Sequence, residues 1–374
     1  MKSAISAFLC LVFSLFFSLA FVPALSFAES NDITLAAILP LSGNAADQGE
    51  WARRGFDLAL AELQSKNNLG MNLEYEDSKG GDPGAAVNAY KGLSARNRPA
   101  VVFTYGSGVG LALSPLVNSD KVIQMGIATA SPKYRSVGDF TFRNFPSASL
   151  EAQFVAAALR HTLKTEHIAI ININNDYGVG TSQALRAAFT GSGGKVLGEE
   201  SFDPGTTDFK PQLLKLKQLQ APAIYLAVYP TDGALLLKQA RELGLKVPFI
   251  ASVAIIGGKD FFSVAGDAAE GLLVASSMTD ASSEFAKDYE RKYPNESSAQ
   301  SIYAARAYDA LKIIGTVIAS CKSAQADCIR DSLFKVHDYH GASGTVSFDE
   351  AGDITTDFAL FRIHDRSFVP ANPG

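Results

Sequence analysis

Serine, threonine and glycine residues concentrate in two short segments that each follow an apolar run. Tyr105–Gly108 follows Val101–Phe103, and Ala128–Ser131 follows Val122–Met125. Such segments offer backbone N–H groups and hydroxyl oxygens, which together bind small polar or anionic ligands. If the apolar runs are parallel strands, both segments emerge at the edge of the sheet where α/β proteins bind ligands. The pattern therefore predicts a binding site for a small polar or anionic ligand.

The same residue types could serve catalysis or nucleotide binding, but the sequence lacks the partners that these activities need. The dinucleotide fingerprint requires a glycine where this chain has Leu111, and no GK[ST] or G-x-S-x-G sequence is present. None of the 5 histidines lies in a predicted strand-end loop, so a catalytic serine has no visible base. His337 and His340 could bind a metal, but a solvated helix end explains them more simply. We therefore expect no enzyme activity, no cofactor and no metal.

A second group of loops adds polar side chains and two tyrosines. These loops are Asp176–Gly178, Tyr229–Gly233 and Ser252–Ile255, and each follows a predicted strand. Two facing sheets would bring Tyr177 and Tyr229 opposite the hydroxyl-rich loops. Hydroxyls on one wall and aromatic rings on the other suit a small polar ligand that has an apolar part.

The elements that must position these loops alternate between strands and helices. The expected strands are Ile33–Leu39, Met71–Tyr75, Val101–Phe103, Val122–Met125, Phe140–Asn144, His167–Asn172, Lys195–Glu200, Ala223–Val228, Phe249–Ser252 and Gly271–Ser276. Segments with helical spacing separate most of them, and near-continuous apolar strands are typical of sheets covered on both faces. This pattern predicts an α/β protein with two doubly wound lobes and mainly parallel sheets.

The two similar runs of strands and helices define the expected domains. In chain order these are lobe 1 (31–147), lobe 2 (148–275), a mainly helical segment that returns to lobe 1 (276–345), and a C-terminal hairpin strand that returns to lobe 2, with a tail (346–374). The hairpin is expected to join Gly344–Phe348 to Asp357–Ile363 through a turn at Asp349–Gly352. The chain length agrees with about two domains.

The N-terminus has the features of a secretory signal peptide. Lys2 precedes an apolar run, Ala7–Val22, and a small-x-small site, Ser26–Ala28, follows it. We expect residues 1–28 to be cleaved. The alternative is an uncleaved membrane anchor, because the apolar run is close to spanning length. The net charge of −5 and the lack of a basic run argue against nucleic-acid binding.

Two cysteines remain after processing, and they are close together in the sequence. Cys321 and Cys328 flank the segment 322–327 in a chain that we expect to be exported. A local disulfide is therefore expected. The alternative is two free thiols in a reducing compartment.

The chain resembles the leucine/isoleucine/valine-binding family of ABC-transporter periplasmic solute-binding proteins, which have the type I periplasmic-binding fold. The matching segments are ITLAAILPLSG, YEDSKGGDPGAAVNAY, TYGSG, ATASP, INNDYGVG, YLAVYPTDG, QARELGLKVPFI and DAAEGLLV. The resemblance implies two lobes joined by a three-strand hinge, with a ligand cleft between the lobes that closes on a small ligand. It also implies a periplasmic location and an ABC permease as the partner. We expect a monomer.

The resemblance assigns roles to individual residues of the two walls. Ser107 matches the serine that binds the ligand carboxylate. Ala128 and Ala130 fall where the next loop contributes backbone groups. Thr129 lies one position before the usual threonine, so the resemblance leaves open which hydroxyl points toward the ligand. The two tyrosines named above match two tyrosines of the second lobe.

Val253 departs from the family pattern. Amino-acid binders of this family carry a glutamate there that pairs with the ligand ammonium, and an ammonium buried without a counter-charge is costly. Either Asp232, Asp176 or Asp47 replaces that glutamate, or the ligand is not an α-amino acid. We expect a transport protein for an amino acid or related small carboxylate. The alternative is a sensory receptor of the same fold for an amide or an aromatic or organic acid, not coupled to transport.

Overall fold

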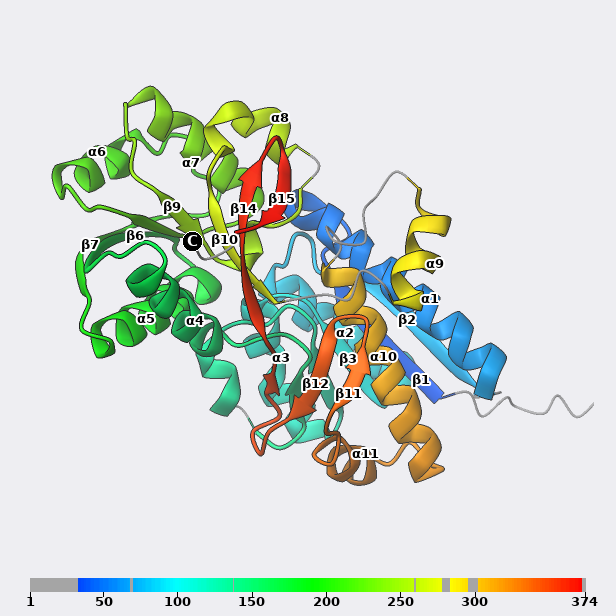
Figure 1. Ribbon diagram of the computed structural model, residues 1–374. Coiled ribbons are helices and arrows are strands. Elements are labelled where there is room, and N and C mark those ends of the chain that lie inside the picture. The colour runs from blue at the N-terminus through cyan, green and yellow to red at the C-terminus, as the bar shows by residue number, and fades with distance from the viewer. Residues whose placement is uncertain are drawn as a thin grey trace, which may run out of the picture. The chain divides into compact units, whose positions relative to one another are not determined.

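The computed structural model describes residues 33–67, 70–136, 138–258, 260–277, 283–294 and 302–371 (Figure 1). The expected signal peptide, residues 1–28, lies outside these ranges. Within them, no helix combines the length and the apolar character needed to cross a membrane.

The first sheet has five parallel strands in the order β2-β1-β3-β4-β5. Its strands are β1 (Ile33–Leu39), β2 (Met71–Asp77), β3 (Val101–Thr104), β4 (Ile123–Gly126) and β5 (Thr141–Arg143). The helices that follow the first three strands are α1 (Ala46–Asn67), α2 (Pro83–Asn97) and α3 (Ser107–Asp120). Asp82 caps α2 by accepting a hydrogen bond from the Ala85 N–H, and Pro83 occupies the first turn. Apolar packing on both faces buries β3 and β4 completely.

The second sheet has seven strands in the order β15-β14-β10-β9-β8-β6-β7. Its parallel strands are β6 (His167–Ile173), β7 (Lys195–Phe202), β8 (Ile224–Ala227), β9 (Phe249–Ala251) and β10 (Leu273–Ser277). The helices of this part are α4 (Ala148–His161), α5 (Asp176–Gly191), α6 (Lys210–Gln218), α7 (Pro230–Glu242) and α8 (Phe261–Ala265). The antiparallel edge consists of β14 (Phe358–His364) and β15 (Ser367–Pro370). The prediction of an α/β fold with two lobes and mainly parallel sheets is confirmed.

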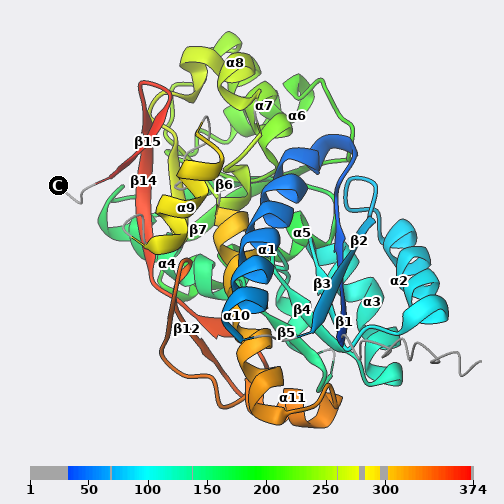
Figure 2. The ribbon, with the colours of Figure 1, turned by 90° about the vertical axis from the view of Figure 1, so that its right-hand side faces the viewer.

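The late helical segment packs against the first lobe. Its helices are α9 (Glu284–Lys292), α10 (Ile302–Cys321) and α11 (Ala326–Leu333). Figure 2 shows α10 beside α1, although more than 200 residues separate them in the sequence. Gly55 permits this close approach, because a β-carbon at that position would lie 2.1 Å from the carbonyl oxygen of Ala304.

The prediction that Gly344–Phe348 pairs with Asp357–Ile363 in a C-terminal hairpin is wrong. β12 (Gly344–Phe348) pairs with β11 (Tyr339–Gly341) and β13 (Ile354–Thr355) in a separate three-stranded sheet. The Asp349 side chain accepts hydrogen bonds from the Ala351 and Asp353 N–H groups, and this local turn directs the chain into β13. β14 instead pairs with β10, which satisfies the backbone groups along that edge of the second sheet.

Three passages connect the seven-stranded sheet with the rest of the chain: after β5, after β10 and between β13 and β14. Arg143 connects the first and third passages. Its Nε and Nη2 atoms donate to the carboxylate oxygens of Asp353, each at 2.6 Å. Arg306 connects the first and second passages, because its Nη2 donates to the Ser277 hydroxyl at 2.9 Å and its carbonyl accepts from the Asn144 side chain at 2.8 Å. Both arginines are fully buried.

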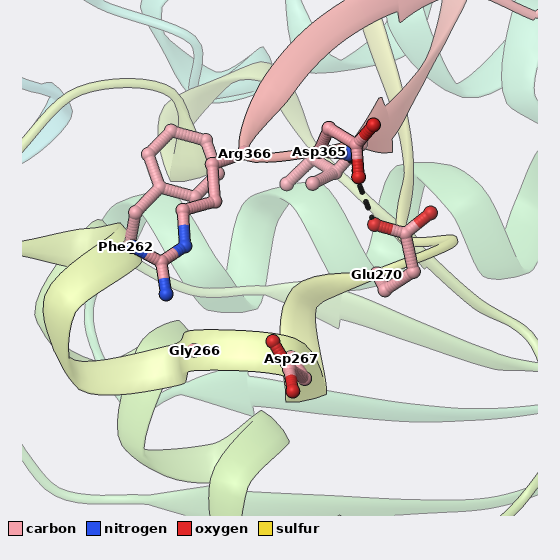
Figure 3. A pocket seen from close by; sticks show the side chains of 7 residues that line it. Phe262, Gly266, Asp267, Glu270, Asp365 and Arg366 are labelled. Carbon is pink, nitrogen blue, oxygen red and sulfur yellow. Dashed lines mark hydrogen bonds between the residues drawn. The ribbon is translucent and has the colours of Figure 1, made fainter.

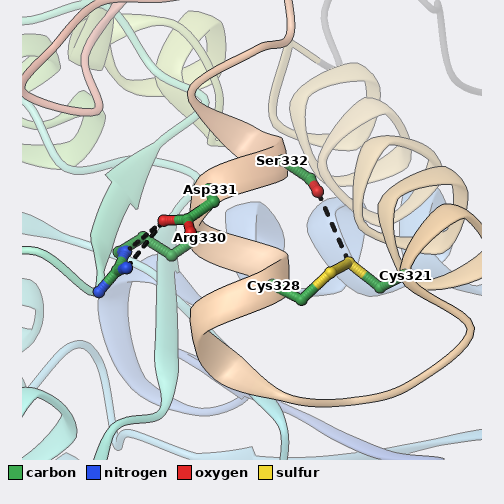
Figure 4. Close-up of a disulfide and its surroundings, with 5 residues drawn as sticks. All are labelled: Cys321, Cys328, Arg330, Asp331 and Ser332. Atoms are coloured by element: carbon green, nitrogen blue, oxygen red, sulfur yellow. Dashed lines mark hydrogen bonds and ion pairs between the residues drawn. A yellow bond between two sulfur atoms is a disulfide. The ribbon is translucent and has the colours of Figure 1, made fainter.

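The structure joins Cys321, at the end of α10, to Cys328, in α11, with their sulfur atoms 2.09 Å apart (Figure 4). The Ser332 hydroxyl lies 3.5 Å from the Cys321 sulfur. The two cysteines are separated by 7 positions, so the disulfide closes a short loop between two helices.

Replacing Arg143 with methionine should lower the free energy of unfolding by about 3–5 kcal/mol, because Asp353 would lose its buried partner. The matched control is Arg135→Met, which removes a half-exposed guanidinium that also contacts Asp353 at 3.3 Å. That change should cost less than about 1 kcal/mol. Urea unfolding followed by circular dichroism measures both. Equal losses in the two variants would contradict the assignment.

The double variant Cys321→Ser/Cys328→Ser should unfold at a lower urea concentration than the wild type. The loop-closure model gives a loss of about 2 kcal/mol for a loop of this length. Reduction of the wild type should give the same shift, and it should leave the double variant unchanged. A shift on reduction of the double variant would show that the effect has another source.

Candidate ligand-binding site

Loops from both large sheets line one cavity of about 420 Å³, a volume that suits a small-molecule ligand. The first lobe contributes Asn44, Ala45, Gln48, Lys79–Pro83 and Tyr105–Gly108. The second contributes Ile173, Asn175–Tyr177, Pro204, Gly205 and Tyr229–Asp232. Four helices, α2, α3, α5 and α7, begin with a residue that lines this cavity, so the positive ends of their dipoles lie beside it.

The residues expected to bind ligand divide into two groups. Ser107, Tyr177, Tyr229 and Asp232 line the cavity. The remaining four, Ala128, Thr129, Ala130 and Val253, do not line it, and Thr129 and Val253 are completely buried. The structure therefore brings only the first group together at the cavity.

The Ser107 hydroxyl ties the two hydroxyl-rich loops together. Its oxygen accepts hydrogen bonds from the N–H groups of Ala130, at 3.2 Å, and Ser131, at 3.1 Å. A serine hydroxyl has two acceptor positions and one proton to donate. Since both acceptor positions are used within the protein, the proton is left for an acceptor in the cavity, such as a carboxylate oxygen. Gly106, with φ of +92°, makes the turn that places Ser107 at the start of α3.

Thr129 does not present its hydroxyl to the cavity. The hydroxyl donates to the carbonyl of Gly106 at 3.4 Å and so stabilises the turn before Ser107. Behind this loop, the Nη1 atom of Arg143 donates to the carbonyls of Thr129, at 3.1 Å, and Ser131, at 2.9 Å. With these two carbonyls held by Arg143, the N–H groups of the loop are oriented toward Ser107.

Two stacked tyrosines form the facing wall. The ring centroids of Tyr177 and Tyr229 lie 5.0 Å apart, with an angle of 23° between the ring planes. Burial raises the pKa of Tyr229 to about 12, so its hydroxyl is neutral at ordinary pH. The Tyr177 hydroxyl is buried beside the Ser252 hydroxyl, and the residue contributes to the cavity wall.

The carboxylates proposed from the sequence differ in their surroundings. Asp232 lines the cavity, and burial raises the pKa of its carboxyl to about 6. Asp176 also lines the cavity and lies 3.7 Å from the ammonium of Lys133. Asp47 does not line it. The structure therefore leaves Asp232 and Asp176 as cavity-facing acids.

The sequence analysis missed Glu151, a buried acid on α4. Its carboxylate accepts hydrogen bonds from the Ser252 hydroxyl, at 3.0 Å, and from the Val253 N–H, at 3.1 Å. Burial raises the pKa of this carboxyl to about 7. A signal was present, because Glu151 occupies a position of helical spacing within an apolar stripe that includes Ala148, Ala152 and Val155.

A second hollow, of about 230 Å³, lies on the second lobe (Figure 3). Glu270 and Asp365 line it, and His364 lies beside them, with ligand atoms of the three residues within 4.8 Å of one another. All three are exposed, and His364 Nδ1 contacts Glu270 at 2.9 Å. Exposed acidic groups of this kind are common without a metal, and none of the expected ligand-binding residues is here. The larger cavity is the better candidate.

Comparison with known proteins agrees with this geometry. Residues 32–367 match the family model described as periplasmic binding protein. The chain belongs to the periplasmic binding protein family. The resemblance stated from the sequence is thereby confirmed. The expectation that the chain is not an enzyme is also confirmed, because this is a family of binding proteins.

Individual relatives have low sequence identity to this chain, but each alignment covers nearly the whole length of the relative. The Leu/Ile/Val-binding protein homolog 3 of Brucella melitensis is 23% identical over 94% of this chain and 97% of its own length. The crystal structure of the leucine-binding protein LivK from Thermotoga maritima has a TM-score of 0.84 at 24% identity, covering 90% of this chain and 97% of that one. A solute-binding protein of an R. palustris ABC transporter, in complex with benzoate, has a TM-score of 0.81 at 16% identity, covering 91% and 95%. These similarities support the two-lobed fold.

Replacing Ser107 with alanine should weaken the binding of a carboxylate ligand by about 10- to 100-fold, the range for a hydrogen bond to a charged group. The variant also frees the N–H groups of Ala130 and Ser131 from their shared acceptor. The control is Ser119→Ala, an exposed serine near the other end of α3. Isothermal titration calorimetry with any carboxylate that stabilises the wild type measures the difference. Unchanged affinity in Ser107→Ala would remove this residue from the site.

Proposed function

We propose that the protein is a periplasmic solute-binding protein that captures a small ligand, an amino acid or a related small carboxylate, and delivers it to an ABC permease. The observation that carries the proposal is the Ser107 hydroxyl. Its oxygen already accepts hydrogen bonds from two N–H groups, which leaves its proton for an acceptor of a ligand in the cavity that Ser107 lines. Relatives named for leucine, isoleucine and valine support an amino acid as the ligand.

Capture by closure of the two lobes is consistent with the sparse polar contacts across the cleft. The Gln48 side chain donates to the Ile256 carbonyl at 3.2 Å, and Lys133 lies 3.7 Å from Asp176. The Lys133–Asp176 pair is exposed, and such pairs contribute little to stability. A ligand that contacts both walls would therefore shift the protein toward the closed state. We propose that the protein acts as a monomer.

The proposed location is the periplasm. Family membership supports it, and the N-terminal sequence pattern of residues 1–28 is that of a cleaved signal peptide. A disulfide between Cys321 and Cys328 agrees with an oxidising compartment, because such bonds are rare in the cytosol.

One observation favours a second class of ligand, aromatic or other organic acids that lack an ammonium group. Val253 is apolar where the family resemblance implies a glutamate, and the similar R. palustris protein binds benzoate. A sensory receptor for such an acid would use the same cavity. Permease and ATPase genes beside the coding gene would favour transport over sensing.

A small carboxylate that binds this cavity should raise the melting temperature of the purified mature protein. The physical reason is mass action, which gives about 2.7 kcal/mol of stabilisation at a ligand concentration 100 times Kd. A thermal-shift screen of amino acids, aliphatic acids, aromatic acids and amides measures it. Small-angle X-ray scattering should show a smaller radius of gyration with each hit.

The control compounds are amines that match the hits but lack the carboxylate, and these should give no shift. Stabilisation by the amines alone, or by no compound of the screen, would contradict the proposed ligand class.

A further inference from the structure

A buried hydrogen bond joins the first helix of lobe 1 to a loop of lobe 2 beside the cavity. The Gln48 side chain, on α1, donates from Nε2 to the Ile256 carbonyl at 3.2 Å. Ile256 follows β9 in the second lobe, and the two residues are only 3% and 6% exposed. This bond is therefore shielded from water, unlike the exposed Lys133–Asp176 pair.

The other end of the Gln48 amide faces the cavity. Gln48 and Tyr105 both line it, and the Tyr105 hydroxyl donates to the Gln48 side-chain oxygen. A backbone carbonyl can only accept, so the NH₂ group of Gln48 must face Ile256 and its oxygen must face Tyr105. The amide has one orientation that satisfies both partners, and that orientation connects the cavity wall to the second lobe.

The next turn of α1 adds an apolar contact with the same loop. Trp51 follows Gln48 by three positions, so both side chains lie on one face of the helix. A β-carbon at Gly257 would lie 2.7 Å from Cζ3 of Trp51 and 3.3 Å from Nε2 of Gln48. Gly257 also has φ of +104°, so glycine suits both the backbone conformation and the close approach. We call Gln48, Trp51, Ile256 and Gly257 the interlobe contact.

The interlobe contact is made mostly by residues that a ligand in the cavity does not reach. Of its four members only Gln48 lines the cavity. On the side away from α1, the loop packs against the second wall, since a β-carbon at Gly258 would lie 2.9 Å from Cβ of Pro230, the first residue of α7. The contact therefore joins α1 to that wall through protein groups alone.

A contact of this kind has a simple consequence for binding. It forms only when the lobes lie together, so it adds the same free energy to the closed state whichever compound is bound. The apparent affinity depends on how readily the binding-competent state forms. The interlobe contact should therefore raise the affinity for every ligand by one common factor.

We propose that the interlobe contact stabilises the closed state and sets the affinity for all ligands by a common factor, with Gln48 as a positioning residue that holds the loop at Ile256 and Gly257. Gln48 acts on the closed state through this loop, although its side chain lines the cavity. This inference rests on the proposed function, which requires the two lobes to close on a small ligand.

Trp51 gives the interlobe contact a signal of its own, because it is the only tryptophan in the sequence. It does not line the cavity, so a bound compound does not touch the ring. Closure packs the ring against Gly257. Binding should therefore shift the tryptophan emission to shorter wavelength and protect it from quenching by acrylamide.

The test is Gln48→Met in the mature protein, a change that keeps the length of the side chain and removes both of its polar ends. The probes are L-leucine, L-isoleucine, benzoate and any other compound that stabilises the wild type in the thermal-shift screen. Isothermal titration calorimetry should show a loss of affinity of about 10-fold, that of one net hydrogen bond, and the same loss within about 2-fold for each compound. Stopped-flow tryptophan fluorescence should place the loss in the dissociation rate.

Matched controls separate the interlobe contact from general effects on the fold. Gln64→Met removes a side-chain amide of the same helix that donates to the Met71 carbonyl at 3.1 Å within lobe 1, and it should keep wild-type affinity. Gly257→Ala tests the contact from lobe 2, outside the cavity, and should weaken every compound by a common factor. Gly244→Ala imposes similar backbone strain, at φ of +71°, where a β-carbon meets no neighbour within 4 Å, and it should bind as the wild type does.

The outcomes distinguish this inference from the proposed function. Unchanged affinity in Gln48→Met overturns the inference. Losses that differ between compounds, with wild-type affinity in Gly257→Ala, also overturn it, because Gln48 would then contact the ligand itself. If Gln48→Met does not fold, Gly257→Ala decides by the same criterion.

If no compound of the screen binds the wild type, the proposed function fails, and the ligand-free protein decides the inference. Acrylamide should then quench Trp51 more strongly in Gln48→Met than in the wild type or in Gln64→Met. Equal quenching in the three proteins overturns the inference.

Discussion

One buried guanidinium, that of Arg143, connects the ligand cavity with the places where the chain passes between its two sheets. Its three nitrogens donate to the carboxylate of Asp353 and to the carbonyls of Thr129 and Ser131. Hydrogen bonds of this kind offset the cost of burying the charge. The loop that supports Ser107 is therefore fixed by the same group that ties the first passage to the third. Precision at the cavity depends on this network.

The two walls of the cavity have different physical characters. The polar groups of the first wall are already hydrogen-bonded within the protein. They leave the hydroxyl proton of Ser107 and the start of α3 for the ligand. The second wall combines the stacked rings of Tyr177 and Tyr229 with the acidic side chains of Asp176 and Asp232. An arrangement with one pre-organised wall and one wall completed by the ligand suits a protein that should close only when it is loaded.

Sequence reasoning succeeded for elements whose signals are local. The strand-end loops of Ser107 and Tyr177 follow from apolar runs, glycines and helix starts that lie within a few residues. It failed for the pairing of β12, because Asp349 forms a turn whose partner strand, β13, is only 2 residues long. It also gave Thr129 no fixed orientation, since its contact with Gly106 depends on packing between two loops.

By itself, the sequence determined the class of the fold, its two repeated modules and the kind of protein, because periodicity, turn chemistry and family motifs are all readable along the chain. Only the tertiary structure decided which acid stands beside Val253. Glu151 and Val253 are 102 positions apart, and on the sequence Glu151 is one polar residue in an apolar helix face. Its place depends on how α4 packs against the end of β9, and no local pattern encodes the relative position of two elements so far apart.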